Sequence, residues 1–301
     1  MSGAGKSREL RAYGALAGGV FCIAWSAIFV RWTSMPGPAS AFYRLLFALI
    51  ALSFFLLRFR RELVSMRRSA VLLGLLGGAF FGADVALFNS AVLKTSAAIA
   101  TLFANNAPLF VGLLTWAIWR RRPSIAFWMG LGIAMAGSIF IFRADGARFA
   151  GSASGDWMAV GASFCFGAYL VITGRLRERV RTELLLGISF LGSTLALLFY
   201  NLGTHTSLRI PDTKALAALL GLAVVCQLLG YFFLTYALGH LSSTVTSVTL
   251  LLIAPLTAVI ALVLFGESVG GAQIIGGILV LAGVGLTNLV SAGRGRIASA
   301  V

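Results

Sequence analysis

Long apolar runs alternate with short polar connectors along the whole chain. Each run is close to the roughly 17–25 residues that a helix needs to cross a bilayer. A membrane β-barrel would instead show alternating polarity over segments of about ten residues. Because lipid offers no partner for backbone N–H and C=O groups, runs of this length predict helices. We predict ten membrane-spanning helices, over residues 13–30, 39–57, 70–92, 97–119, 124–142, 156–174, 184–200, 215–238, 244–265 and 270–290.

Composition agrees with this pattern. Hydrophobic residues make up 59% of the chain and charged residues 11%, against about 45–50% and 25% in soluble domains. A soluble fold could not bury that much apolar surface and still cover itself with polar groups. The connectors are too short to hold a soluble domain. The sequence therefore predicts an all-α polytopic membrane protein embedded in the lipid bilayer.

The net charge of +15 is of the kind that nucleic-acid-binding domains carry on one exposed face. Here the basic residues form short clusters between apolar runs, so we expect no nucleic-acid partner. Seventeen of the 24 Lys and Arg residues fall in one set of alternate connecting or terminal segments, six fall in the other set, and Arg44 lies within a run. Basic segments stay on the cytoplasmic side of a membrane. The pattern predicts a multi-pass protein of the bacterial inner membrane with both termini in the cytoplasm.

Three local patterns recur in the second half of the chain in the same order and at a nearly constant offset. They are Gly18-x-x-Phe21-Cys22 with Gly161-x-x-Phe164-Cys165, Pro108 with Pro255, and Gly130 and Gly137 with Gly276 and Gly283. This order predicts two copies of one five-helix unit, residues 1–147 and 148–301. A unit with an odd number of spans enters the membrane from the opposite side when it is repeated. The two halves are therefore expected to form an inverted repeat, an architecture that provides alternating access to a central site.

Two charged residues lie within the predicted spans, where a charge costs about 2.5–3.5 kcal/mol on insertion scales. Asp84 is the acid and Arg44 the base, and both fall in the outer half of their spans. One interpretation is that they bind a zwitterionic substrate or, in the case of Arg44, gate its access. The other interpretation is a structural ion pair between two helices.

Proline and asparagine interrupt two of the spans. Asn105 and Asn106 precede Pro108 in the fourth span, and Pro255 lies in the ninth. Proline removes a backbone hydrogen bond from a helix interior and bends it. We expect both helices to bend near the midplane, with Asn105 and Asn106 as candidates for substrate contact. The alternative is that the bends serve packing alone.

Aromatic and amide side chains also fall in mid-span positions. Trp25, Tyr169, Gln227 and Tyr231 are spaced so that they could line one central cavity. A cage of rings with a few polar groups would suit an aromatic or bulky apolar ligand. Ordinary packing between helices is the competing explanation for each of them.

One face of the third span carries small residues at intervals of four. Such a stripe allows a second helix to approach closely, and it places Asp84 on the opposite side, toward a cavity. The residues are Gly74, Gly78, Gly82, Ala86 and Ser90.

Taken together, these features resemble the drug/metabolite transporter superfamily in its EamA-type branch. The matching residues are Phe21 to Trp25, Tyr43-Arg44-Leu45, Pro108, Pro255 and Gly266-Glu267. The resemblance covers essentially the whole chain and is greatest to bacterial amino-acid exporters, including exporters of aromatic amino acids. One departure is that Trp119-Arg120 stands in the first half where the second half has Gly266-Glu267.

The sequence-based hypothesis is a secondary exporter of small metabolites, foremost aromatic or neutral amino acids, that works by alternating access. We expect a monomer with no cofactor, no metal and no enzymatic activity, since a lone Asp without a paired acid or histidine cannot support the usual acid–base chemistry. The alternative is a proton-coupled drug or cation exporter, although the first span carries no acid between Tyr13 and Val30. A carrier of phosphate esters would need several basic residues at the midplane, and Arg44 alone is present.

Overall fold

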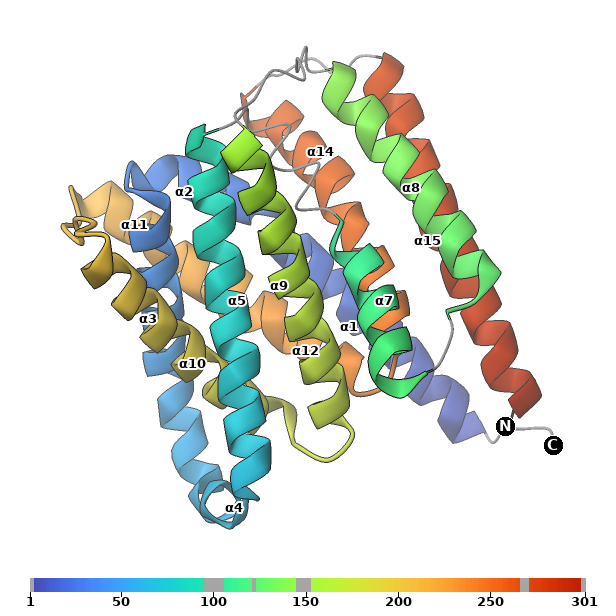
Figure 1. Ribbon diagram of the computed structural model, residues 1–301, viewed down its shortest axis with the longest axis horizontal. Coiled ribbons are helices and arrows are strands. Elements are labelled where there is room, and N and C mark those ends of the chain that lie inside the picture. The colour runs from blue at the N-terminus through green and yellow to red at the C-terminus, as the bar shows by residue number, and fades with distance from the viewer. Residues whose placement is uncertain (1–2, 95–105, 121–122, 145–152, 266–270, 299–301) are drawn as a thin grey trace.

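The structure is a computed structural model that describes residues 3–94, 106–120, 123–144, 153–265 and 271–298. These residues form helices and connectors and contain no β-strand. The all-helical, polytopic class is therefore as the sequence predicts. In Figure 1 the helices stand roughly side by side across the molecule.

The described residues of the first half form seven α-helices and a short 3₁₀ turn. They are α1 (Gly3–Ala24), α2 (Ser26–Thr33), α3 (Gly37–Leu56), η1 (Leu57–Phe59), α4 (Arg60–Ser65), α5 (Arg68–Lys94), α7 (Ala107–Trp119) and α8 (Ile125–Ala144). The second half comprises α9 (Ala153–Arg177), α10 (Thr182–Gly203), α11 (Thr213–Gly221), η2 (Leu222–Gly230), α12 (Tyr231–Leu238), α13 (Ser243–Thr249), η3 (Leu250–Leu252), α14 (Ile253–Phe265) and α15 (Gly271–Ala298).

Six stretches of the described chain are long and apolar enough to cross a membrane. They are Arg8–Val30, Gly37–Ser65, Arg68–Phe88, Trp157–Arg177, Thr213–Leu238 and Thr182–Gly203. Shorter apolar helices occupy parts of the other four predicted spans, at Ala107–Ile118, Ile125–Gly137, Ser243–Thr257 and Ile274–Thr287. The positions of the apolar helices thus follow the prediction, and the exact count of ten crossings stays a prediction.

Polar side chains cap the first turns of α11 and α13. The Asp212 carboxylate accepts a hydrogen bond from the Ala215 N–H at 2.7 Å and begins α11. Ser242 does the same for the Val245 N–H at the start of α13. Each side chain satisfies one of the backbone donors that a first turn leaves without a partner.

The two prolines differ in their surroundings. Pro108 is the second residue of α7, where a proline loses no intrahelical hydrogen bond because that N–H has no acceptor in a first turn. Pro255 lies within a continuous helical run, in which α13, the 3₁₀ turn η3 and α14 follow one another from Ser243 to Phe265. An irregularity near Pro255 is therefore present as a 3₁₀ turn, and a bend in each span stays a prediction.

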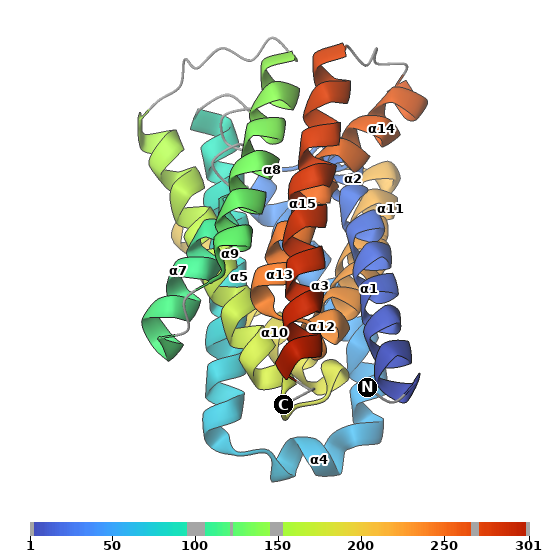
Figure 2. The ribbon, with the colours of Figure 1, turned by 90° about the vertical axis from the view of Figure 1, so that its right-hand side faces the viewer.

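Helices from the two halves of the chain pack against each other throughout the molecule. α5 lies along α9 and α10, α1 lies along α12 and η2, and α7 packs on α9 while α14 packs on α1. α8 and α15 form a separate antiparallel pair, side by side in both views (Figures 1 and 2). The main core gathers buried residues of α1, α3, α5, α9, α10 and α12.

Glycine allows the closest of these contacts. A Cβ at Gly78 would collide with the backbone carbonyl of Ser189, and the Ser193 hydroxyl donates to the Gly78 carbonyl at 2.7 Å. The stripe on the third span therefore packs α5 against α10, as predicted. Gly130 lies against Gly283 across the α8–α15 contact.

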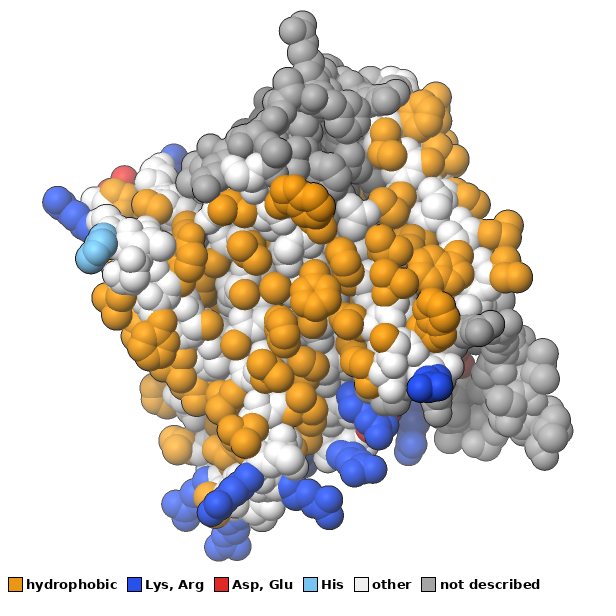
Figure 3. Space-filling view, in the orientation of Figure 1, with side chains coloured by type: hydrophobic (Ala, Val, Ile, Leu, Met, Phe, Trp, Pro, Cys, Tyr) orange, Lys and Arg blue, Asp and Glu red, His pale blue; other side chains and the backbone are white. Residues whose placement is uncertain are grey.

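Apolar and charged side chains occupy different parts of the surface. Apolar side chains cover the middle of the face in Figure 3, and Lys and Arg side chains gather at its lower edge. α4 lies at that end, and α1 begins and α15 ends there (Figures 1 and 2). The exposed arginines of this end include Arg8, Arg11, Arg58, Arg60, Arg61, Arg67, Arg68, Arg120, Arg175, Arg179 and Arg181.

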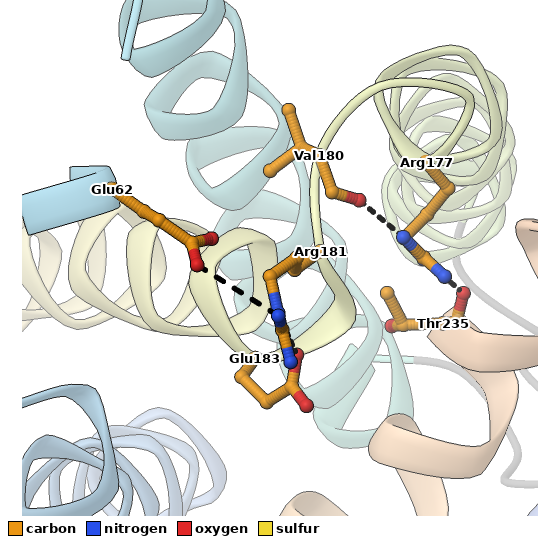
Figure 4. A network of polar contacts seen from close by, with 6 residues as sticks. All are labelled: Glu62, Arg177, Val180, Arg181, Glu183 and Thr235. Carbon is orange, nitrogen blue, oxygen red and sulfur yellow. Dashed lines mark hydrogen bonds and ion pairs between the residues drawn. The ribbon is translucent and has the colours of Figure 1, made fainter. Parts of the chain in front are cut away.

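A polar network joins the connectors at this same end (Figure 4). The Arg177 guanidinium donates to the carbonyl of Thr235 at 3.0 Å and to the carbonyl of Val180. Arg181 lies 3.6 Å from Glu183 and 3.8 Å from Glu62. The network therefore links α9 to α12, and the start of α10 to α4.

Candidate functional site

Arg44 is a charged residue of α3 that is almost fully buried, with 8% of its surface exposed. Its Nε donates to Gln227 Oε1 at 2.9 Å, and its Nη1 donates to Ser26 Oγ at 3.2 Å. A guanidinium carries five N–H donors. Within the described part of the chain, the other three have no acceptor.

The Gln227 side chain is 0% exposed and adds an unused donor beside Arg44. Its oxygen must face the arginine, because only an oxygen can accept from Nε. Its amide nitrogen then points elsewhere, and among the described residues that nitrogen has no hydrogen-bond partner. Gln227 lies in η2, a π-helical stretch from Leu222 to Gly230. Such wide turns are rare in helices and occur frequently at functional sites.

Ser26 reaches Arg44 from an interruption in the first span. The Ile28 and Phe29 N–H groups both bond to the carbonyl of Trp25, so Ile28 leaves the carbonyl of Ala24 unused. The Thr257 hydroxyl of α14 donates to that carbonyl at 3.0 Å. The second half of the chain thus stabilises the interruption.

Asp84 lies on α5, half-buried, on the side of the helix away from the glycine contact with α10. Its carboxylate is close enough to interact electrostatically with Arg44 and with the Tyr231 phenol. Across the described residues, however, Asp84 has neither a hydrogen bond nor an ion pair within 4.0 Å. The direct Asp84–Arg44 pair considered from the sequence is therefore not formed, and the two charges face the same region from separate helices.

Aromatic rings form one wall beside these charges. Tyr169 of α9 and Tyr231 of α12 each pack on Phe81 of α5, with ring centroids 4.9 and 4.8 Å apart. Phe166 stacks on Tyr169 at 6.1 Å. Phe81, Tyr169 and Tyr231 are each at most 6% exposed. The rings contact one another, so they form a packed wall.

Trp25 belongs to a different group of rings. Its indole lies 6.4 Å from Phe21 and 6.2 Å from Phe29, all on the first span. The structure thus brings Arg44, Asp84, Gln227, Tyr169 and Tyr231 together and leaves Trp25 beside them. The expected single cage of Trp25 with both tyrosines is not what the rings form.

The remaining candidates lie around α7 and α14. Asn106 is the residue that precedes the first turn of α7, with Pro108 buried just after it. Asn105 and the Gly266-Glu267 motif lie outside the described residues. Pro255 packs near Gly277 of α15, so it contacts the neighbouring helix.

Sequence reasoning missed two residues of this centre. Phe81 precedes Asp84 by three positions and so shares its helix face, which is a signal that could have identified it. Ser26 is a hydroxyl residue within the first span and could have been noted for that reason. Its role depends on the interruption at Trp25, which has no proline or glycine to reveal it.

These residues can bind opposite charges at two separate points. One point offers the unused N–H groups of Arg44 and Gln227, and the other offers the carboxylate of Asp84. Among the described residues, no group of three or more His, Cys, Asp and Glu side chains could hold a metal ion. The arrangement suits recognition of a small polar ligand.

Comparisons with known proteins give a consistent picture. The model of the family described as EamA-like transporter family matches residues 10–143 and again residues 153–289. The uncharacterized transporter YwfM of Bacillus subtilis is 29% identical over 66% of this chain and 67% of its own. A probable terminal-alkyne amino-acid exporter of Streptantibioticus cattleyicolor is 29% identical over 77% of both chains. A solved crystal structure with 18% identity shares the fold, with a TM-score of 0.77 over 96% of this chain and 99% of that one.

Proposed function

The chain belongs to the EamA-like transporter family, and from that premise we propose that it exports amino acids, aromatic or neutral, across the bacterial inner membrane. The observation that carries this proposal is the pair of separated charges at the centre, Arg44 and Asp84. An α-amino acid carries one negative and one positive group in fixed relation, and this site presents one charge of each sign. No nucleotide-hydrolysing unit is needed for such a secondary transporter.

The relatives add limited support for the substrate. The Streptantibioticus cattleyicolor relative is described as a probable amino-acid exporter, whereas YwfM is described as an uncharacterized transporter. A family likeness supports transport, and the substrate has to be argued from the site. The site argument therefore carries the choice of amino acids.

Contacts between the helices support alternating access by an inverted repeat. If residues 1–147 and 148–301 are equivalent units, then α1 corresponds to α9, α3 to α10, and α5 to the α11–η2–α12 span. The contact of α5 with α9 then corresponds to that of α12 with α1, and the contact of α5 with α10 to that of η2 with α3. The two matched stretches of the family model have the same division. Two related packings of equivalent units would expose the centre to each side in turn.

The basic end of the molecule supports a cytoplasmic position for both termini. Single cysteines placed in 58–69 and 175–183 should react with a membrane-impermeant thiol reagent only after the inner membrane is opened. Cysteines in 201–212 should react in intact spheroplasts. The opposite labelling pattern would contradict the proposed orientation.

A counterflow assay tests the function directly. Purified protein in liposomes preloaded with one amino acid should accumulate the same labelled amino acid from outside, and empty liposomes should not. A panel of aromatic, neutral, acidic and basic amino acids would define the substrate class. If no amino acid exchanges while lipophilic cations do, the proposal is wrong.

The alternative of a proton-coupled cation exporter has one observation in its favour. Asp84 is half-buried and unpaired among the described residues, as a proton-carrying acid would be. The buried guanidinium of Arg44 opposes this alternative, because it would repel a cationic ligand held close to Asp84. The amino-acid proposal explains both charges.

A further inference from the structure

The donors around Arg44 lack an acceptor in a place where such a lack is costly. Leaving a buried polar group without a hydrogen bond costs about 1–3 kcal/mol, and more for a charged group. Gln227 is 0% exposed, and its buried Nε2 has no hydrogen-bond partner among the described residues. The same residues provide no acceptor for three N–H groups of Arg44, which is 8% exposed. A bound anion would supply acceptors to these donors.

We propose that Arg44 and Gln227 bind the carboxylate of the substrate and that Asp84 binds its ammonium group. This inference rests on the proposed function and specifies how the same site recognises its ligand. An arginine fork matches the two oxygens of a carboxylate, and charge-assisted bonds of this kind are about twice as strong as neutral ones. Gln227 and Ser26 hold the guanidinium through Nε and one N–H of Nη1, which leaves the second N–H of Nη1 and both N–H groups of Nη2 for the ligand.

The separation of Asp84 from Arg44 is the second observation. Two opposite charges in a shared, poorly solvated region would gain most by direct contact, and neither makes one. Tyr231 stands between the two charges in the contacts that it makes: its ring packs on Phe81, three residues before Asp84, and it follows Gln227, the partner of Arg44, by four residues. A ligand with a positive and a negative end would complete both partial sites, whereas a simple anion or cation would leave one of them unmatched.

One pair of variants separates the two ends of the ligand. Gln227→Glu keeps an oxygen facing Arg44 Nε and pairs the guanidinium internally, so the fold is retained while the carboxylate site is filled by a negative charge. Asp84→Asn removes the charge that would hold the ammonium group and keeps the side-chain size. Thr246→Val is the matched control, because Thr246 is 0% exposed and its hydroxyl has no partner among the described residues, outside this site.

The probes are phenylalanine and leucine, their decarboxylated amines (2-phenylethylamine and isopentylamine) and their deaminated acids (3-phenylpropionate and 4-methylpentanoate). Dissociation constants are measured on purified protein by competition with a labelled amino acid or directly by calorimetry. Gln227→Glu should weaken the binding of amino acids and of deaminated acids roughly tenfold or more, as the loss of one charged contact implies. The same variant should bind the amines as tightly as the wild-type protein or more tightly. Asp84→Asn should weaken the binding of amino acids and amines and leave the binding of the acids unchanged.

The outcomes distinguish this inference from the proposed function. In one outcome, the wild-type protein binds amino acids while each variant lowers the affinities for amines and acids equally, or lowers neither. Recognition of the two ends by separate residues is then wrong, and the proposal of amino-acid transport stands. If the wild-type protein binds the amines and neither amino acid, the proposed function itself fails. A Thr246→Val variant that reproduces the split between amines and acids would also overturn the inference.

Discussion

The contact between α8 and α15 and the centre around Arg44 use opposite means to bring helices together. At the α8–α15 contact the backbones touch: a Cβ at Gly137 would stand 2.5 Å from the Gly276 carbonyl and 2.7 Å from the Val280 N–H. At the centre, helices meet through polar side chains with unused donors. Small residues at a helix contact serve close packing, whereas unmatched buried polar groups lower stability. The comparison indicates that the glycine contact serves close packing, whereas the centre carries the polar groups on which the proposed function depends.

The largest effect is expected where the glycine contact is broken. Gly137→Leu introduces a side chain where backbone atoms of α15 stand, and these cannot move aside as a flexible side chain could. Overpacking typically costs about 1–3 kcal/mol, and a backbone collision falls at or above the top of that range. We expect little monodisperse protein after extraction in mild detergent, as measured by size-exclusion chromatography.

Gly132→Leu provides the control on the same helix, because nothing lies within 4 Å of a Cβ at that position. It should extract and elute like the wild-type protein. Equal yields for the two variants would show that α8 and α15 are not fixed at this contact.

The next effect tests the polar centre. Gln227→Leu removes the acceptor of Arg44 Nε and should lower stability by about 3 kcal/mol, since a buried charge loses a hydrogen bond. Replacing both partners, with Arg44→Met and Gln227→Leu, should leave stability unchanged or raise it by about 1–4 kcal/mol, because well-packed apolar residues replace a buried polar pair. Melting temperatures in detergent and amino-acid counterflow measure the two properties.

The double variant should be stable and inactive. A double variant that melts far below the wild-type protein would mean that Arg44 is there for stability, and it would place the centre in the same class as the glycine contact.

Both regions could be predicted in part from the sequence. The glycine stripe of α5 and the repeated glycines of α8 and α15 indicate close packing by their spacing alone. A small residue at regular helical intervals is visible in a short stretch of sequence. Arg44 and Asp84 stand out because charge within a span is costly. The lack of a direct contact between the Arg44 and Asp84 side chains could not be predicted. The sequence indicates the depth of each residue in the membrane, but it does not indicate the rotation of each helix about its axis.

The irregular backbone was beyond sequence reasoning. Proline suggested bends inside two spans, whereas Pro108 stands in the first turn of α7 and Pro255 follows a 3₁₀ turn within a continuous helical run. The interruption at Trp25 and the π-helical turn around Gln227 carry no proline. Both depend on partners distant in sequence, such as Thr257 for the first span, and a local pattern does not contain that information.

A smaller effect is expected at Arg177, which has the same side-chain type as Arg44 and the opposite environment. Its donors bond to backbone carbonyls of Thr235 and Val180, so the charge serves structure. Arg177→Gln should lower stability by about 2 kcal/mol, as charged hydrogen bonds are lost, without changing which ligands bind. Melting temperature and the relative affinities for amino acids, amines and acids measure this.

Arg175→Gln is the matched control two residues earlier, where an exposed pair with Glu178 is lost. Exposed ion pairs contribute at most about 1 kcal/mol, so its melting temperature should stay near that of the wild-type protein. If Arg177→Gln altered the preference between amines and acids, the division between structural and binding arginines would fail.

The smallest effect is expected at Thr257, where structure and function meet. Thr257→Val keeps the shape and removes the hydroxyl that bonds to the Ala24 carbonyl at 3.0 Å. Side-chain hydrogen bonds between membrane helices average about 0.6 kcal/mol, so the melting temperature should fall slightly. Thr204→Val removes an exposed hydroxyl that donates to a carbonyl four residues earlier, and its melting temperature should not fall.

The interruption at Trp25 also places Ser26 on Arg44 Nη1. Thr257→Val should therefore weaken the binding of amino acids and acids more than the binding of amines. A lower melting temperature with unchanged affinities would assign the interruption to packing alone, and it would restrict the binding centre to Arg44, Gln227 and Asp84.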